Sequence, residues 1–247
     1  MLNIFSNFKV ISIATGILLI GFLPGHSASP KPQYPLRLPS SEVIIERIPY
    51  VLAYDGRNKQ ARWVYEVLTT ESIQGNADRH KFTFEEDPLI HSLIRSTRED
   101  YSGSGFDRGH LCPAADARLN DAQMKETFYF SNVSPQCPQF NRGYWLKLER
   151  HVRDLAKRYG VIHVFTGGLY LPFQDSDGKR YVKYQVIGQN DVAVPTHFFK
   201  VILGNNGASL ESFILPNEAI PGTTPLKEFL TTIEKVEKVS GIIFSKK

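Results

Sequence analysis

The sequence reads Gly105-Phe106-Asp107-Arg108-Gly109-His110 near its middle. Its last four residues bring together a carboxylate, a guanidinium group, a flexible glycine and an imidazole. Hydrolysis of a phosphodiester needs a base for water, positive charge for the transition state and usually a divalent cation. The alternative is a loop in which Asp107 and Arg108 pair and His110 is an ordinary polar residue. The motif alone leaves both interpretations open.

The residues that follow the motif favour a site. They include Ser131-Asn132-Val133-Ser134-Pro135-Gln136, then Asn141-Arg142-Gly143 and Glu149. Apolar residues at steps of three and four predict a helix over residues 141–159, ended by Gly160. Asn141 and Glu149 lie eight residues apart, which is about 80° around an ideal helix. Both side chains can therefore face one site.

An amide and a carboxylate suit Mg²⁺, a hard cation that binds oxygen and keeps most of its waters. The common alternatives are that Asn141 is an N-cap and that Glu149 pairs with Arg153 one turn later, each worth about 1 kcal/mol or less. A zinc site of thiolates or several histidines is not visible in the sequence. The pair therefore points to a magnesium-type site if it is a site at all.

The remaining pattern predicts mixed α and β structure. Short aromatic and β-branched runs at 50–54 and 62–68 predict a hairpin, and further strands are expected at 161–166, ending at Gly167-Gly168, and at 182–186. Runs at 197–203 and 209–215 flank Asn205-Asn206-Gly207, a favourable hairpin turn. Thr224-Pro225 is expected to begin a helix that reaches residue 239. No linker divides residues 45–247, which predicts one domain.

The composition is that of an ordinary globular protein. The chain has 247 residues, of which 42% are hydrophobic and 22% charged, and this excludes disordered, collagen-like and coiled-coil proteins. Lys and Arg number 29 against 25 Asp and Glu, for a net charge of +4. That excess is too small for a purely electrostatic nucleic-acid binder. If the protein handles nucleic acid, its basic residues must be arranged locally.

The first 28 residues read as a leader. They carry one charged side chain, Lys9, followed by an apolar run over residues 10–23, which suits a secretory signal peptide and is short for a membrane span. We therefore expect a secreted or periplasmic protein without stable membrane association once the leader is removed. A mitochondrial address and a retained anchor through residues 10–23 are the alternatives. Residues 29–44 are rich in proline and predict a linker.

Taken together, the motifs resemble the DNA/RNA non-specific endonuclease family, and most closely its endonuclease G-like branch. The resemblance extends in order over residues 49–203 and includes Tyr50-Val51-Leu52-Ala53-Tyr54, Trp63-Val64, Asp78-Arg79, Phe84-Glu85-Glu86-Asp87, Tyr101-Ser102-Gly103-Ser104-Gly105-Phe106, Thr127-Phe128-Tyr129, Thr166-Gly167-Gly168-Leu169-Tyr170-Leu171-Pro172 and Val194-Pro195-Thr196-His197-Phe198-Phe199-Lys200. It implies an α+β fold with a ββα-metal (His-Me finger) active site on a central, mostly antiparallel sheet flanked by helices.

The resemblance also implies an activity and a set of roles. The activity is metal-dependent hydrolysis of DNA and RNA to 5′-phosphate ends, with Mg²⁺ or Mn²⁺ as the cofactor and a homodimer as the assembly. The implied roles are His110 as general base, Asn141 as direct metal ligand, Glu149 as a ligand through water, Asn132 as a positioning residue, Arg79 as the cation that stabilises phosphate charge, and Arg108 and Asp107 as residues that position the loop or contact substrate.

The two cysteines depart from the endonuclease G pattern. Cys112 and Cys137 are the only cysteines, and each lies within five residues of a proposed site residue. Export would permit a disulfide that braces the His110 loop. Two small buried thiols are the alternative, because the sequence does not give their separation.

Three functions therefore remain open. The leading hypothesis is a Mg²⁺-dependent nuclease, and the second is a nucleic-acid-binding protein with little turnover. The third is a structural or interaction protein with a buried polar cluster. The third requires that His110, Asn141 and Glu149 do not converge in space.

Overall fold

We analysed a computed structural model, which describes residues 42–244. These residues lie in one compact unit. The predicted leader and most of the predicted linker fall outside the described residues. The first strand begins at Glu42, so the last residues assigned to the linker already belong to the sheet.

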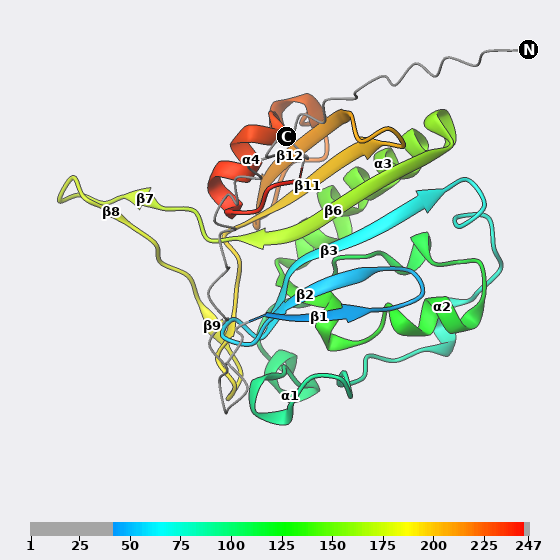
Figure 1. The fold of residues 1–247 in the computed structure, drawn as a ribbon. Helices are drawn as coiled ribbons and strands as arrows, with labels where there is room; N and C mark the ends of the chain where they lie inside the picture. The colour runs from blue at the N-terminus through cyan, green and yellow to red at the C-terminus, as the bar shows by residue number, and fades with distance from the viewer. Residues whose placement is uncertain (1–41, 245–247) are drawn as a thin grey trace, which may run out of the picture. The chain divides into compact units, whose positions relative to one another are not determined.

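A seven-stranded sheet organises residues 42–244 (Figure 1). Its order is β1-β2-β3-β6-β11-β12-β13, and every neighbouring pair is antiparallel. The strands are β1 (Glu42–Glu46), β2 (Val51–Asp55), β3 (Gln60–Thr69), β6 (Val161–Leu169), β11 (His197–Gly204), β12 (Ser209–Pro216) and β13 (Leu230–Thr231). The two predicted hairpins are confirmed as β2–β3 and β11–β12.

Helices cover both faces of this sheet. One face packs on a π-helix (Phe140–Trp145) that continues into α3 (Leu146–Tyr159), and Trp145, Leu148 and Val152 are buried there in the main core. The other face packs on α4 (Ile233–Ser240), through a cluster that includes Val236. Alternate residues of each strand point to opposite faces, so a strand such as β3 contributes to both cores.

A small ladder stands beside the main sheet and leads into the long helix. β4 (Asp107–His110) pairs antiparallel with β5 (Val133–Gln136), with His110 opposite Val133. The remaining short elements are α1 (Arg98–Tyr101), α2 (Asp121–Glu126), β7 (Phe173–Gln174), β8 (Arg180–Tyr181), β9 (Val186–Ile187), β10 (Val192–Ala193) and 3₁₀ turns at Arg79–Lys81, Ser92–Ile94, Ala114–Asp116, Phe130–Asn132 and Leu226–Phe229. The β7–β8 hairpin projects away from the sheet in Figure 1.

Both long helices differ from their predicted form. The 141–159 segment is helical and ends at Gly160, whose φ of 79° suits a glycine, but its first turn is a π-helix. The helix expected over residues 224–239 is only half formed. Leu230 and Thr231 instead pair with β12 at the sheet edge, and α4 begins after Thr232, whose side chain accepts a hydrogen bond from Lys235 N.

Two strand predictions were also wrong in part. β6 does not stop at Gly167-Gly168 but runs to Leu169, because both glycines pair with β11. A Cβ at Gly167 would overlap the carbonyl oxygen of Arg62, so glycine permits close packing here. Of the strand expected at 182–186, only Val186 is in a strand, where it belongs to β9 and pairs with Ala193. The side chains of residues 182–186 are all exposed, so their alternation has no buried face to stabilise a longer strand.

Candidate active site

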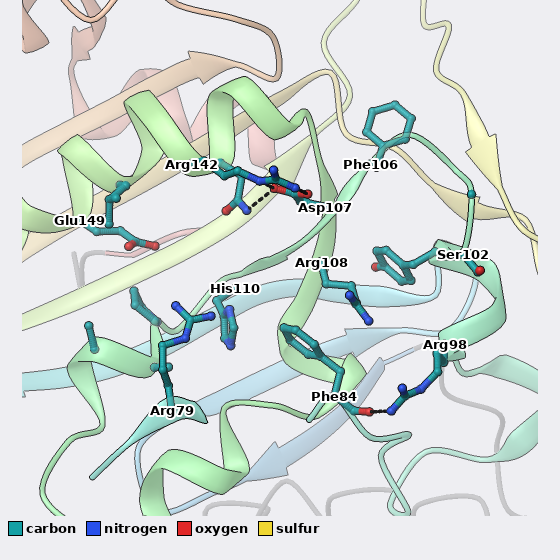
Figure 2. A pocket seen from close by; sticks show the side chains of 17 residues that line it. Arg79, Phe84, Arg98, Ser102, Phe106, Asp107, Arg108, His110, Arg142 and Glu149 are labelled. Carbon is teal, nitrogen blue, oxygen red and sulfur yellow. Dashed lines mark hydrogen bonds and ion pairs between the residues drawn. The ribbon is translucent and has the colours of Figure 1, made fainter. Parts of the chain in front are cut away.

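A cavity of about 740 Å³ lies between the β4–β5 ladder, the start of the long helix and the loops around residues 79 and 98–106. It is lined by six of the predicted site residues, namely Arg79, Asp107, Arg108, His110, Asn141 and Glu149. Residues separated by 70 positions in the sequence thus converge on one space (Figure 2). The condition for the structural-protein hypothesis, that His110, Asn141 and Glu149 lie apart, is not met.

His110 ends β4 and turns its ring into the cavity between two aromatic rings. The ring centroids of Phe84 and Phe128 each lie 5.1 Å from that of His110. Its Nε2 is buried and has no hydrogen-bond partner among the described residues. Burial, with a smaller contribution from the charge of Arg79, lowers the pKa of His110 to about 3. The ordinary imidazole pKa of about 6.5 therefore does not apply to this buried ring.

Asn141 and Glu149 reach the cavity from the same helical segment. Asn141 sits in the π-helix, where its Nδ2 donates to Asp107 Oδ2 at 2.9 Å. Glu149 sits in the first turn of α3 with 9% of its surface exposed, and Figure 2 shows its carboxylate directed into the cavity. Burial raises the pKa of Glu149 to about 7, although Lys200 opposes the shift. The alternative interpretation, in which Glu149 pairs with Arg153, is not what the structure shows, because Arg153 forms an ion pair with Asp116 at 2.7 Å.

Asp107 and Arg142 form an ion pair at one wall of the cavity (Figure 2). The Arg142 guanidinium donates from Nε to Asp107 Oδ2 at 2.8 Å and from Nη2 to Oδ1 at 2.6 Å. Burial of Asp107 disfavours its charge, but hydrogen bonds from Arg142 and Asn141 outweigh burial and hold its pKa below the usual range. Asp107 is thus a carboxylate that remains charged beside the site.

Arginines give the cavity a local positive charge. Four line it, and the acids that line it are Asp107 and Glu149. Arg79 belongs to the 3₁₀ turn Arg79–Lys81, and Arg108 lies over the Phe84 ring with its Cζ 5.0 Å from the centroid. The local arrangement of basic residues that the small net charge requires is therefore present.

Asn132 does not line the cavity but braces the strand end that carries His110. It is fully buried, and its Oδ1 accepts from Cys112 N while its Nδ2 donates to the carbonyl oxygens of Cys112 and Thr127, all at 2.9 Å. The role of Asn132 as a positioning residue stays a prediction.

The structure shows both cysteines as free thiols. Cys112 is buried and donates from Sγ to Glu66 Oε2 at 3.2 Å, whereas Cys137 contacts Gln139. Cys112 thus fits the alternative of a buried thiol, whereas Cys137 is only partly buried, and their pairing under oxidising conditions stays a prediction.

Among the other residues of the cavity, Arg98 carried no signal in the sequence, whereas Phe84, Tyr101 and Phe106 stand in the quoted motifs without a predicted role. Arg98, Phe84 and Phe106 line it together with Tyr101, whose hydroxyl is buried without a partner among the described residues. Arg98 comes from α1 and donates to the Phe84 carbonyl at 2.9 Å. Only the fold brings α1 beside β4, so no spacing in the sequence pointed to Arg98 as a residue of the cavity.

The oxygen donors at the cavity fit a hard divalent cation. The Asn141 amide nitrogen is engaged by Asp107, which directs its carbonyl oxygen away from that carboxylate. Within residues 42–244, the Glu149 carboxylate has no hydrogen-bond or ion-pair partner, and no group of three or more His, Cys, Asp or Glu side chains is placed to hold a metal. One amide and one carboxylate match the few protein ligands that Mg²⁺ takes.

A model of the DNA/RNA non-specific endonuclease family matches residues 27–247. The chain belongs to this family. The nuclease is 46% identical over 210 residues to mitochondrial endonuclease G of Homo sapiens, with 84% of this chain and 71% of that protein covered. It is 50% identical over 206 residues to nuclease C1 of Cunninghamella echinulata var. echinulata, with 81% of each covered. EndoG in its solved complex with EndoGI matches with a TM-score of 0.80 and 46% identity, over 84% of this chain and 87% of that one.

These comparisons confirm the endonuclease G-like resemblance and the ββα-metal fold that it implied. They support a hydrolytic nuclease with a nucleic-acid substrate and a divalent metal. They also bear on the cellular location. The human relatives endonuclease G and EXOG are mitochondrial by name, which agrees with the mitochondrial alternative to export. No helix among residues 42–244 has the length and apolar character needed to cross a membrane.

Proposed function

We propose that this nuclease is a sugar-non-specific endonuclease that uses Mg²⁺ or Mn²⁺ to hydrolyse phosphodiester bonds of DNA and RNA to 5′-phosphate ends. One observation carries the proposal. An uncharged imidazole with a buried, unpartnered Nε2 faces a cavity that Asn141 and Glu149 also line. A base, an oxygen-donor pair and arginines around one space are the parts that phosphodiester hydrolysis requires.

His110 would act as the general base. Nε2 accepts a proton from a water molecule as that water attacks the phosphorus atom, and the bond from phosphorus to the 3′ oxygen breaks. The phosphate then stays on the 5′ end of the next nucleotide. The pKa of about 3 keeps the ring uncharged at neutral pH, and the negative charge of a bound phosphate would raise it toward the range where a base works best.

Asn141 would hold the cation through Oδ1 and Glu149 through a water molecule. When bound, the cation supplies positive charge at the scissile phosphate and at the departing 3′ oxygen. Arg79 lies on the same side of the cavity as His110 (Figure 2) and would stabilise the negative charge that grows on the phosphate. Arg108 would contact the strand beside it. Asn132 acts one step away, by keeping the backbone after His110 in place.

Digestion of a plasmid and of a structured RNA by the purified nuclease tests the proposal. We expect cleavage of both with Mg²⁺, none with EDTA, and a loss of at least about 100-fold in His110→Ala, the range typical of a general base. The matched control is His80→Ala, which removes an exposed imidazole and should retain the activity. Full activity of His110→Ala would exclude His110 as the base.

The product ends and the binding alternative have their own readouts. Ends that ligase joins without prior kinase treatment carry 5′-phosphates, as the proposal requires. A nucleic-acid-binding protein with little turnover would instead bind DNA and leave it intact at saturating Mg²⁺.

The homodimer remains a prediction, to be checked by light scattering of the purified chain. Export remains a prediction about residues 1–28, to be checked by cell fractionation and N-terminal sequencing.

A further inference from the structure

Asn141 can present either end of its amide to the cavity, and only one end suits a cation. The side chain is planar, with a donor nitrogen and an acceptor oxygen of similar size. A cation needs the oxygen, and an inward nitrogen would oppose it. In the structure, a single hydrogen bond sets the orientation of the amide, and Asn141 Nδ2 donates it to Asp107 Oδ2 at 2.9 Å. A carboxylate accepts hydrogen bonds and does not donate them when it is charged, so it selects the nitrogen.

Asp107 is itself held by Arg142, the residue that follows Asn141. The Arg142 fork engages both carboxylate oxygens, at 2.8 and 2.6 Å, and a bidentate pair of this kind fixes orientation as well as charge. The side chain of Arg142 is 73% exposed while that of Asp107 is only 15% exposed. Arg142 therefore reaches back from the rim of the cavity to hold a carboxylate in its wall.

We infer that Arg142 is a positioning residue that acts through Asp107 to keep the carbonyl oxygen of Asn141 turned toward the cation. The same two hydrogen bonds from Arg142 keep the Asp107 carboxylate from turning into the cavity, where it would compete as a ligand for the cation or repel phosphate. Asp107 thus orients the metal ligand and does not contact the substrate. This inference rests on the proposed function, because it takes Asn141 as the ligand.

In Arg142→Gln, the loss of positive charge and the loss of orientation should change the cation affinity in opposite directions. Removal of a positive charge near a cation site would by itself strengthen cation binding. Loss of the fork would free Asp107 and Asn141 and weaken binding, as loss of partners around a metal ligand does. Arg142→Gln therefore separates the two effects, whereas in Asp107→Asn both effects weaken binding.

The measurement is the dissociation constant of Mn²⁺ in isothermal titration calorimetry, with the full chain and no nucleic acid. We expect binding about 3-fold to 10-fold weaker in Arg142→Gln and about 10-fold or more weaker in Asp107→Asn, since partners of this kind contribute about 10-fold to 100-fold to metal affinity. Arg142→Lys, which keeps the charge without the fork, should bind at least as weakly as Arg142→Gln, because it loses the orientation and keeps the repulsion of the cation. Arg150→Gln, which removes an exposed arginine from α3, is the matched control and should bind like wild type.

The outcomes separate the inference from the function on which it rests. Equal or tighter Mn²⁺ binding by Arg142→Gln, with weak binding by Asn141→Ala, overturns the role of Arg142 and leaves Asn141 as the ligand. Wild-type binding by Asn141→Ala overturns the metal site and the inference with it. A second readout is the side-chain amide signal of ¹⁵N-labelled Asn141, whose hydrogens should exchange faster in Arg142→Gln than in Arg150→Gln. Equal exchange rates would count against the inference.

Discussion

Asn132 shows how a residue outside the cavity can determine the position of the base inside it. All three of its hydrogen bonds join backbone groups, two of them on Cys112, which follows His110 by two positions. Every one of these bonds is buried. The Asn132 side chain therefore supplies hydrogen bonds to the backbone that follows β4, where no neighbouring strand supplies them. These bonds hold His110 in place.

Replacement of Asn132 by Ala should lower the free energy of unfolding by about 2–4 kcal/mol, because it leaves three buried backbone groups without partners. Nuclease activity per folded molecule should fall as well, since the His110 ring loses its support. Urea denaturation and steady-state digestion measure the two effects. Asn205→Ala, in the exposed β11–β12 turn, is the control and should change stability by less than about 0.5 kcal/mol. A stable Asn132→Ala variant would refute the bracing role.

Gly109 links the residue scale to that of the β4–β5 ladder. A Cβ built at Gly109 would overlap the side chain of Gln136, which is fully buried on β5. The motif therefore needs glycine between Arg108 and His110 for close packing of two strands. Gly143, in the π-helix, differs because nothing lies within 4 Å of its Cβ position.

The same substitution should accordingly have opposite effects at the two glycines. Gly109→Ala should destabilise the fold by about 1–3 kcal/mol, because Gln136 must move, and should reduce cleavage by displacing His110. Gly143→Ala should stabilise the helix by up to about 1 kcal/mol, because alanine loses less backbone entropy. Thermal unfolding of the two variants, side by side, checks the signs. Destabilisation of equal size in both would contradict the packing explanation.

Local signals allowed prediction of the elements that carry their own pattern. The β2–β3 and β11–β12 hairpins have aromatic and β-branched runs on either side of turn-forming residues, and both formed. The π-turn at Phe140–Trp145 and the edge strand β13 could not be foreseen, because each depends on what lies opposite in space. Residues 182–186 failed for the reverse reason. They alternate well, but all of their side chains are exposed, and Tyr184 packs on the ring of Tyr170.

The candidate site divides in the same way. His110, Asn141 and Glu149 were predicted because they stand in motifs with recognisable spacing. The hydrogen bonds between Arg142 and Asp107 join residues that lie 35 positions apart in the chain. No periodicity of the sequence predicts such a contact. The charge state of His110 was also beyond the sequence, because it follows from burial between aromatic rings.

On the scale of the whole molecule, the net charge of +4 does not reveal that positive side chains are concentrated at the cavity. Four arginines face one cavity, and a protein that neutralises phosphates with such groups releases counterions. Arg108 lies there over Phe84, while Arg150 is exposed on α3. The two arginines contribute equally to the net charge but differently to substrate binding.

Arg108→Gln should therefore weaken DNA binding and flatten its salt dependence, by about one unit in the slope of log K against log salt if one phosphate contact is lost. Arg150→Gln should leave the slope unchanged. Fluorescence anisotropy of a labelled duplex, in EDTA so that it stays intact, gives both quantities over a series of salt concentrations. Identical slopes in the two variants would mean that Arg108 does not contact phosphate.

Behind the cavity lies a second charged cluster, buried in the core between the sheet and α3. Lys200 is 1% exposed and donates to Thr166 at 2.6 Å, and Glu66 is 3% exposed and accepts from Cys112. Burial, reinforced by the charge of Asp116, raises the pKa of Glu66 to about 8. The folded protein therefore holds a proton on Glu66 at pH values where the unfolded chain has released it.

This proton links stability to pH with a definite sign. Between the ordinary glutamate pKa of about 4.5 and the folded pKa of about 8, the folded state binds more protons than the unfolded state, so stability contributed by Glu66 is full below that window and is lost as the pH rises through it. Glu66→Gln keeps the size of the side chain and cannot ionise, so it should be more stable than wild type by on the order of 1 kcal/mol or more at pH 9 and should differ least at pH 5. Urea midpoints at the two pH values, with exposed Glu46→Gln as control, measure the difference. If Glu66→Gln and wild type show the same change in midpoint between pH 5 and 9, then Glu66 is charged in the fold and Lys200 neutralises it.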